Sequence, residues 1–420
     1  MKQKTLDSWL QYIESLHPET IELGLDRIRA VAGRMALRPI ASATIIVAGT
    51  NGKGSVVALL EAIYLAAGYS VGSYTSPHLV RYNERVHLNG EEVLDQDLCQ
   101  AFEAVEAARE QTALTYFEFG TLAAAYILQS QKLDVAILEV GLGGRLDAVN
   151  LFDADIAIVT GIDVDHSDWL GKDRESIGYE KAGIFRTGKT AICGDTKPPS
   201  SVIDRATEVG AELSLQGRDF SFQCRQHDCQ FDGAGLSWAG LPPPALTGQH
   251  QQLNLGSALM AVGSLQASLP VTRAQAAKAI AMTTVAGRFQ RVHSQPEVVL
   301  DVAHNPQAIS ALARTCFETP VTGNTLAVVG MMQDKAIEDA LAALAESIDH
   351  WYLASLPPPR GADAAVLKNT LEHIGIKKPV GEFTDVSSAY HAALSDAQPQ
   401  DRVLVFGSFV TVGAIMHELG

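Results

Sequence analysis

Short apolar runs, each ending in glycine or polar residues, recur along the first half of the chain. They are 45–47, 71–74, 135–140, 156–160 and 191–193. Several of them are separated by segments whose apolar residues have helical spacing, and residues 6–40 show the same spacing before the first run. This alternation predicts a mainly parallel sheet with crossover helices. Ligand-binding loops are then expected at the carboxyl ends of the strands.

The pattern changes at residues 219–247, where apolar and polar residues alternate between turn residues. A period of two predicts small antiparallel strands, which Pro242-Pro-Pro244 would end. Two helices are expected to follow, over about 251–268 and 272–282.

A second set of strands and helices starts near Ala286. Its predicted strands are 298–302, 325–329, 351–354 and 403–406. Its predicted helices are about 306–316, 335–347, 363–374 and 385–395. We therefore expect an α/β protein in which residues 1–285 form a mainly parallel sheet domain with a small antiparallel β subregion. Residues 286–420 would form a second, Rossmann-like α/β domain.

Composition and charge narrow the class of protein. The 420 residues are 47% hydrophobic and 19% charged, which is typical of a globular chain too long for one core. No apolar run reaches the roughly 20 residues of a membrane-spanning helix, and the N-terminus lacks the apolar core of a signal peptide. We expect a cytoplasmic monomer. The net charge of −16 argues against a nucleic-acid or anionic-membrane surface. A substrate with several carboxylates would need locally placed basic residues.

Cysteine usage adds little chemistry. The five cysteines are Cys99, Cys193, Cys224, Cys229 and Cys316. Only Cys224 and Cys229 lie close together, and no second pair completes a zinc site. Free thiols in a reducing compartment are expected.

The segment Ala48-Gly-Thr-Asn-Gly-Lys-Gly-Ser55 stands between a predicted strand and a predicted helix. A glycine-rich turn there aims backbone N–H groups at one point, which suits a phosphate. Lys53 could reach a terminal phosphate and Ser55 could ligate Mg²⁺. The first domain is thus of the P-loop type, although Gly54 interrupts the common Gly-Lys-Ser/Thr ending. The alternative is a glycine-rich turn without a ligand.

Other strand ends carry candidate ligands. Glu139 enters a glycine-rich loop, where it could hold a metal or pair with Arg145. His166 follows the strand 156–160 and could complete a metal shell, or could be merely solvated. Ser76 could ligate a metal or simply begin a turn. Lys181, taken alone, resembles a lysine on a helix surface.

The second domain also carries candidate ligands at the end of a predicted strand. Asp301 ends a predicted strand, where it could hold a ribose hydroxyl, and His304 follows it. Arg288 could grip phosphate as two domains close, or form an interdomain salt bridge.

Together these motifs resemble the folylpolyglutamate synthase family of the Mur ligase superfamily. Eight segments match in order over nearly the whole chain. They are Gly49–Ser55, Ser76–Leu79, Tyr116–Glu118, Glu139–Asp147, Asp165-His166 followed by Leu170-Gly171, Glu180–Gly183, Asp301–Pro306 and Gly330–Lys335. The extra Gly54 is normal in that family. The run Asp165–Arg186 looks most like the bifunctional bacterial type.

The resemblance implies an ATP-dependent ligase. ATP would phosphorylate a carboxylate of a pterin substrate, and glutamate would attack the acyl phosphate. Dihydropteroate would give dihydrofolate, and reduced folates would gain further glutamates.

The resemblance also implies residue roles. The phosphates would be held by Gly49, Thr50, Asn51, Gly52, Lys53, Gly54 and Ser55. One Mg²⁺ would be served by Ser55, Ser76 and Glu139, and a second by Glu139, His166 and a carbamylated Lys181. Adenine, phosphates and ribose would meet Asn254, Arg288 and Asp301. The pterin would meet Phe117 and Asp147, while His304 and Ser408 would lie near glutamate.

Alternatives remain at this point. A monofunctional folylpolyglutamate synthase is one alternative, because the sequence does not fix whether both folate activities are present. A Mur ligase for a UDP-muramyl precursor would share the fold but usually carries a separate N-terminal domain, and about 40 residues precede the first predicted strand here. A nucleotide-gated binding protein without ligase activity is disfavoured by the presence of Glu139, His166, Lys181 and His304. A simple P-loop kinase would leave the second domain without a task.

Overall fold

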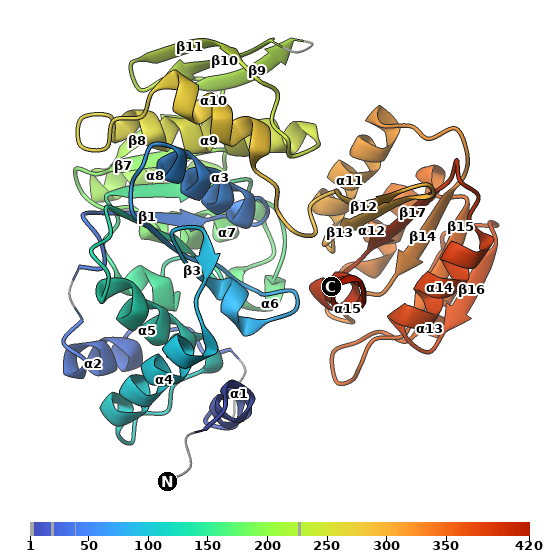
Figure 1. The fold of residues 1–420 in the computed structure, drawn as a ribbon, viewed down its shortest axis with the longest axis horizontal. Helices are drawn as coiled ribbons and strands as arrows, with labels where there is room; N and C mark the ends of the chain where they lie inside the picture. The colour runs from blue at the N-terminus through green and yellow to red at the C-terminus, as the bar shows by residue number, and fades with distance from the viewer. Residues whose placement is uncertain (1–3, 18–20, 38, 226–227) are drawn as a thin grey trace. The chain divides into compact units, whose positions relative to one another are not determined.

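A computed structural model describes residues 4–17, 21–37, 39–225 and 228–420. The chain folds into two compact units (Figure 1). Unit 1 is built from the chain up to residue 78 and from 82–245 and 252–283, and unit 2 is built from 79–81, 246–251 and 284–420. No helix in the described ranges is long and apolar enough to cross a membrane.

Unit 1 is organised around an eight-stranded sheet with the order β4-β3-β2-β5-β1-β6-β7-β8. Its strands are β1 (Ala43–Ala48), β2 (Val71–Tyr74), β3 (Val86–Leu88), β4 (Glu91–Glu92), β5 (Val135–Glu139), β6 (Ile156–Val159), β7 (Thr190–Cys193) and β8 (Glu212–Leu215). All neighbours are parallel except β2–β3 and β3–β4. The predicted parallel sheet is therefore confirmed. β1 and β5 are buried along their whole lengths, as strands covered on both faces must be.

Helices cover this sheet. They are α1 (Leu6–Glu14), α2 (Asp26–Arg34), α3 (Lys53–Ala66), α4 (Asp95–Arg109), α5 (Tyr116–Gln129), α6 (Ser167–Leu170), α7 (Arg174–Lys181), α8 (Ser200–Val209), α9 (Gln249–Ser264) and α10 (Arg273–Met282). Alternate strand residues such as Ile46 and Leu138 join the core that includes α4 and α5. The segment 6–40, expected to be helical, holds α1 and α2 with a break between them, and its positions 18–20 and 38 lie outside the described residues.

A three-stranded antiparallel sheet confirms the period-two prediction. It has the order β11-β10-β9 and is made of β9 (Ser221–Arg225), β10 (Asp228–Gly233) and β11 (Leu236–Leu241). Phe222 and Phe231 face each other across β9 and β10, and both are buried.

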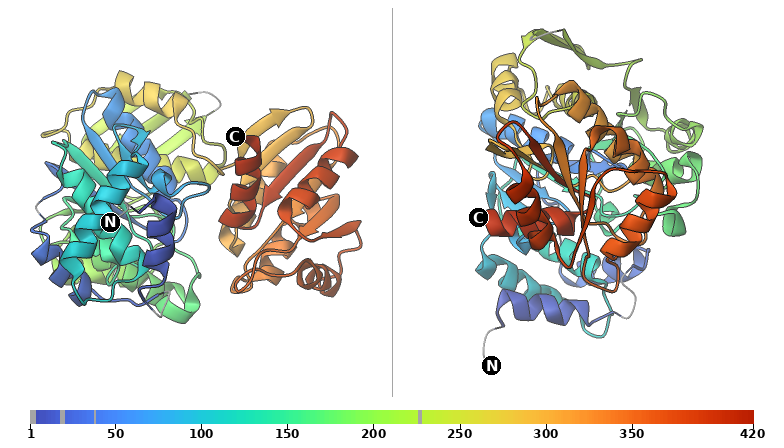
Figure 2. Two further views of the ribbon diagram at one scale, coloured as in Figure 1. Left: turned by 60° about the horizontal axis from the view of Figure 1, so that its bottom comes forward. Right: turned by 90° about the vertical axis from the view of Figure 1, so that its right-hand side faces the viewer.

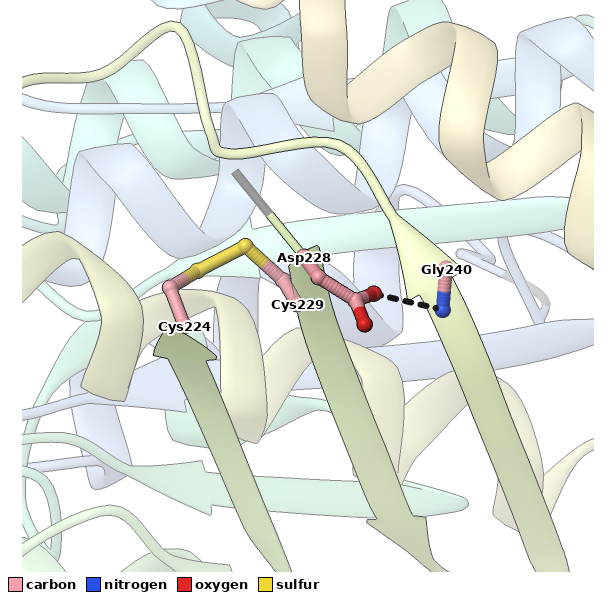
Figure 3. The surroundings of a disulfide bond; sticks show 4 residues. All are labelled: Cys224, Asp228, Cys229 and Gly240. Carbon is pink, nitrogen blue, oxygen red and sulfur yellow. Dashed lines mark hydrogen bonds between the residues drawn. A yellow bond between two sulfur atoms is a disulfide. The ribbon is translucent and has the colours of Figure 1, made fainter. Parts of the chain in front are cut away.

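The expectation of five free thiols is wrong at one place. Cys224 and Cys229 lie opposite each other on β9 and β10, with a Cα–Cα distance of 4.0 Å, and form a disulfide (Figure 3). Spacing along the chain did not reveal this pairing, because the hairpin, and not the sequence separation alone, brings the two Cβ atoms together. Cys99, Cys193 and Cys316 are free, as expected, and the structure shows that they are buried.

Unit 2 contains a six-stranded sheet with the order β12-β13-β17-β14-β15-β16. Its strands are β12 (Gln290–Ser294), β13 (Glu297–Asp301), β14 (Thr325–Val329), β15 (His350–Ala354), β16 (Val380–Phe383) and β17 (Arg402–Phe406). Only β12 runs antiparallel to its neighbour. The predicted Rossmann-like α/β architecture is confirmed.

Helices lie on both faces of the unit 2 sheet (Figure 2). They are α11 (Pro306–Glu318), α12 (Ile337–Leu344), α13 (Ala364–His373), α14 (Val386–Asp396) and α15 (Phe409–Leu419). Residues of α11, α12 and α13 share one core with Ala327 and Val329, whereas residues of α14 and α15 share the other with Leu326 and Val328. α11 begins as predicted, because Asn305 Oδ1 accepts from Ala308 N at 3.0 Å.

Each unit has a tryptophan buried in its core. Trp9 packs against Phe102 in unit 1, and Trp351 lies in the core of unit 2. Both indole N–H groups are buried without a hydrogen-bond partner in the described part of the chain.

Candidate active site

The P-loop connects β1 to α3, as the sequence predicts. Gly52 is the N-cap of α3 with φ +93°, a conformation that favours glycine. Lys53 Nζ donates to the carbonyl oxygens of Gly49 (3.1 Å) and Thr50 (3.3 Å), so the ammonium group is folded over the loop. Ser55 Oγ is buried and has no hydrogen-bond partner among the described residues. A buried hydroxyl without a partner is costly unless a ligand supplies one.

The P-loop is anchored to the loop after β6. Thr50 Oγ1 donates to Asp163 O (2.9 Å) and accepts from Asp163 N (3.0 Å). Thr160 Oγ1 donates to Asn51 O at 2.6 Å. These contacts use Thr50 and Asn51 to fix the loop geometry. Asn254, on α9, lies against the P-loop, since a Cβ on Gly52 would collide with its amide.

Glu139 and Ser76 meet at the carboxyl ends of adjacent strands. β5 lies between β1 and β2, so Glu139 at its end lies beside the segment that follows β2. Ser76 N donates to Glu139 Oε2 at 3.3 Å. Within the described ranges, no group of three or more His, Cys, Asp or Glu side chains could hold a metal. Any ion at this place therefore depends on hydroxyl, phosphate or modified ligands beside Glu139.

Arg145 is not the partner of Glu139. Its guanidinium forms an ion pair with Glu180, with Nη2 and Oε1 2.8 Å apart, and its backbone N donates to Glu180 O at 2.8 Å. The end of α7 thereby packs onto the glycine-rich loop. Gly144 permits this approach, because a Cβ there would lie 2.8 Å from Lys181 O.

Lys181 is buried, so the view of it as a lysine on a helix surface is wrong. Only 4% of its surface is exposed. Burial, followed by the positive charge of Lys53, lowers the Lys181 pKa to about 7, while Asp165 and Asp147 oppose the shift. A large part of the Lys181 population is therefore a neutral amine near neutral pH.

His166 lies at the start of the short helix α6. It has φ +53°, and its backbone N donates to Asp165 Oδ1 at 2.8 Å. The same loop carries Asp163, which holds the P-loop threonine. His166 thus belongs to the cluster of loops around the P-loop and is exposed in unit 1.

Phe117 and Asp147 both contact the loop that follows β5. The Phe117 ring lies against Gly141 and stacks on Tyr74, with ring centroids 6.0 Å apart. Asp147 Oδ2 accepts from Leu142 N (2.8 Å) and Oδ1 from Val149 N (2.9 Å). Burial raises the Asp147 pKa to about 7 despite these hydrogen bonds. An aromatic face and a buried carboxyl group here suit a polar ring system.

The N-terminal segment also reaches this part of unit 1, which the sequence did not indicate. Gly24 N donates to Leu146 O at 3.3 Å, and Arg27 Nη2 donates to Glu118 Oε1 at 3.2 Å. Periodicity describes only local structure and carries no signal for such tertiary contacts.

Unit 2 places its predicted residues around the end of β13. Asp301 accepts from the backbone N of Phe289 and of Ala303, each at 2.8 Å, and burial raises its pKa although Arg288 opposes this. Arg288 Cζ lies 5.4 Å from the centroid of the Phe409 ring, and the His304 ring lies 6.1 Å from it. Ser408 caps α15, with its Oγ accepting from Thr411 N at 3.0 Å.

Comparisons with known proteins identify the family of the chain. The family described as Mur ligase middle domain matches residues 47–262, and Mur ligase, glutamate ligase domain, matches residues 287–409. The dihydrofolate synthase/folylpolyglutamate synthase of Escherichia coli is 47% identical over 98% of this chain and 95% of its own length. The Mycobacterium tuberculosis protein of the same description is 30% identical over 94% of this chain and 90% of its own length.

Solved structures give the same result. The E. coli FolC structure in complex with DHPP and ADP has a TM-score of 0.93 and 46% identity, covering 99% of this chain and 98% of that one. A bifunctional enzyme from Yersinia pestis with AMPPNP and Mn has a TM-score of 0.91 and 44% identity over 99% and 98% of the two chains. The chain therefore belongs to the dihydrofolate synthase/folylpolyglutamate synthase family of Mur ligases.

Proposed function

We propose that this chain is an ATP-dependent, ADP-forming ligase that adds L-glutamate both to dihydropteroate and to reduced folates. The observation that carries this proposal is 47% identity to the bifunctional E. coli enzyme along almost the entire chain. Such similarity covers 98% of the chain and so extends over both units, which is more than a shared fold. The protein would act in the cytoplasm as a monomer.

The reaction has two steps. An oxygen of the substrate carboxylate attacks the γ-phosphorus of ATP, which gives an acyl phosphate and ADP. The glutamate amine then attacks the acyl carbon, phosphate leaves with the C–O electron pair, and the amine loses a proton. Both steps bring anions together, so positioned cations and N–H donors are the main need of the catalyst.

The P-loop supplies those donors. Residues Gly49–Ser55 would hold the phosphates through backbone N–H groups. Lys53 Nζ, which donates to two loop carbonyl oxygens, would turn to the transferred phosphoryl group.

The donor set fits a divalent cation. Ser55 offers the buried hydroxyl that has no described partner, and Glu139 lies beside Ser76, so these three residues would hold one Mg²⁺. Glu139, His166 and a carbamylated Lys181 would hold a second. Bound Mg²⁺ would offset phosphate charge.

Carbamylation of Lys181 has a physical basis in this chain. The neutral amine attacks the carbon of CO₂ and loses a proton, which leaves an N-carboxylate. A lysine whose pKa is about 7 supplies that neutral amine at physiological pH. The product would exchange a buried cation beside Lys53 for an anion, which removes a repulsion.

The remaining roles divide between the two proposed domains, 1–285 and 286–420. Phe117 and Asp147 would bind the pterin in the first. In the second, Arg288 would meet phosphate, Asp301 the ribose, and His304 and Ser408 the glutamate. Asn254 would meet the adenine.

Mass spectrometry of the products tests this function. The purified protein would receive MgATP and L-glutamate with dihydropteroate, with a reduced monoglutamyl folate, or with a UDP-muramyl acceptor. We expect a glutamyl product from both pterin substrates. Addition to the folate alone would indicate a monofunctional enzyme, addition to the muramyl acceptor another Mur ligase, and ADP without any amide a protein that is not a ligase.

A further inference from the structure

Arg85 is a buried arginine that none of the roles above uses. It ends the short 3₁₀ helix η1 (Tyr82–Arg85), and 8% of its surface is exposed. Its Nε donates to His78 Nδ1 at 2.9 Å, and its Cζ lies 5.2 Å from the Tyr82 ring centroid and 5.7 Å from that of Tyr116. Two tyrosine rings and a histidine therefore hold the guanidinium in place.

This guanidinium has no counter-ion within the part of the chain that the structure describes. No ion pair joins Arg85 to an Asp or Glu side chain there. His78 cannot offset the charge, because burial and then the charge of Arg85 lower its pKa to about 4, so the ring is a neutral acceptor. A buried, unpaired cation is unfavourable unless an anion joins it. The Nη groups of Arg85 keep donors for that anion.

Arg85 also lies on the pterin side of unit 1. Its backbone O accepts from Thr75 N at 2.8 Å, directly before Ser76. Tyr116, which it faces, precedes Phe117. The charges of Arg85 and Asp147 both affect the pKa of the Tyr74 hydroxyl, so both groups lie near the same tyrosine. In a chain of net charge −16, such a cation is the local basic residue that a carboxylate substrate needs.

We propose that Arg85 is a specificity-determining residue that binds a carboxylate of the acceptor through its Nη donors. The inference rests on the proposed function. That carboxylate has two possible sources. Dihydropteroate offers only its benzoate carboxylate, which is the group that reacts. In a glutamyl folate the benzoate is an amide, so the glutamyl tail offers both the carboxylate that reacts and a second, α-carboxylate. The geometry of an arginine suits either, because its parallel N–H groups match two carboxylate oxygens.

Equilibrium titration of the whole protein tests this binding role. Dihydropteroate and a reduced monoglutamyl folate would be titrated into wild type, Arg85→Gln and Arg85→Lys, with ADP as a third ligand. We expect Arg85→Gln to raise the Kd for an acceptor about 10- to 100-fold and Arg85→Lys to recover part of it, with the ADP Kd unchanged. Arg273→Gln is the control, since that exposed arginine of unit 1 donates only to backbone oxygens.

The acceptors separate the two sources. If Arg85→Gln binds both acceptors more weakly, Arg85 binds the reacting carboxylate. If it binds only the folate more weakly, Arg85 binds the α-carboxylate of the tail. Each result supports the proposal. An acceptor Kd within about twofold of wild type in Arg85→Gln, with or without a fall in kcat, overturns it. If Arg85→Gln does not fold, a carboxamide analogue of each acceptor replaces it: unweakened binding of both analogues to wild type overturns the proposal.

A different result would contradict the proposed function. A wild-type protein that forms no glutamyl product contradicts the ligase assignment, whereas the Arg85 comparison needs only binding.

Discussion

Asp147 in unit 1 and Asp301 in unit 2 have the same local role and different neighbours. Each accepts two backbone N–H groups with its carboxylate, and burial raises the pKa of each. Asp147 shares its surroundings with Lys53 and Lys181, whose pKa falls to about 7. Asp301 lies near Arg288, whose guanidinium lies over the ring of Phe409.

This difference indicates that the polar groups of unit 1 depend on bound ligands more than those of unit 2. Unit 1 holds a carboxyl group and an amine that both titrate near pH 7, together with a buried hydroxyl, Ser55 Oγ, that lacks a described partner. Such a site is unfavourable by itself and improves when phosphate, metal or CO₂ arrives. The described polar groups of unit 2, such as Asp301 and Ser408, organise its own backbone. Changes in unit 1 should therefore reduce activity more than changes in unit 2.

The largest effect is expected from Lys53→Ala. Without the ammonium group, charge on the transferred phosphoryl group is not offset, so the rate of ADP formation should fall by about 10³-fold or more with every acceptor. A coupled ADP assay measures this. Lys278→Ala, which changes an exposed lysine of α10, is the matched control and should be normal. Normal turnover of Lys53→Ala would refute the P-loop assignment.

Lys181→Met should lose activity yet gain stability. The Lys181 pKa is lower in the folded state than in the unfolded one, so the unfolded state binds more protons between about pH 7 and 10.5. Wild-type stability should therefore rise with pH through that window, and Lys181→Met should lack this rise. Denaturant titrations without CO₂ or metal should show a gain of about 4 kcal/mol at pH 7. If the free energy of unfolding of the two proteins depended equally on pH, the pKa of Lys181 would not be lowered in the folded state.

Asp147→Asn tests both the raised pKa of Asp147 and its proposed role in binding the pterin. Because the folded-state pKa of Asp147 is raised to about 7, wild-type stability should fall as pH rises from about 4 to 7, and the variant should not show this fall. We also expect its Michaelis constant for dihydropteroate to rise about tenfold, with the Kd for ADP unchanged. An unchanged Michaelis constant would reject the pterin role.

The smallest effect belongs to Ser408→Ala in unit 2. Loss of the N-cap of α15 should lower the free energy of unfolding by about 1 kcal/mol. Asp385→Ala removes the exposed cap of α14, where Asp385 Oδ1 accepts from Ser388 N at 2.8 Å, and is the control for lost capping. Steady-state kinetics then separate two roles: a higher Michaelis constant for glutamate in Ser408→Ala alone supports a ligand, and equal behaviour supports a cap only.

Much of the fold could be predicted from periodicity, because buried parallel strands are continuous apolar runs and the antiparallel strands alternate. The strands that were missed are short or lie at sheet edges: β3, β4, β8, β12 and β16. Residues such as Glu91 and Glu92 of β4 are exposed, so no apolar pattern identifies that strand. Its pairing comes from β3 and not from its own composition.

The site was predictable only where chemistry coincides with a local motif. The P-loop is such a case, since glycines, lysine and serine stand together. Lys181 is the opposite case: its burial results from the close approach of α7 to Gly144, which no spacing reveals. Arg85 shows the same limit, because its environment comes from Tyr116, a residue 31 positions away along the chain.

The tryptophans sealed into the two units have an optical consequence. Trp9 and Trp351 have indole N–H groups without a described partner, so their emission should lie toward the blue and resist quenching by iodide. Trp169, on α6 beside His166, is 46% exposed, and its emission should lie toward the red and be quenched readily. Fluorescence could therefore follow the unfolding of each unit with single-tryptophan variants, and could follow the His166 loop in the folded protein without any added label.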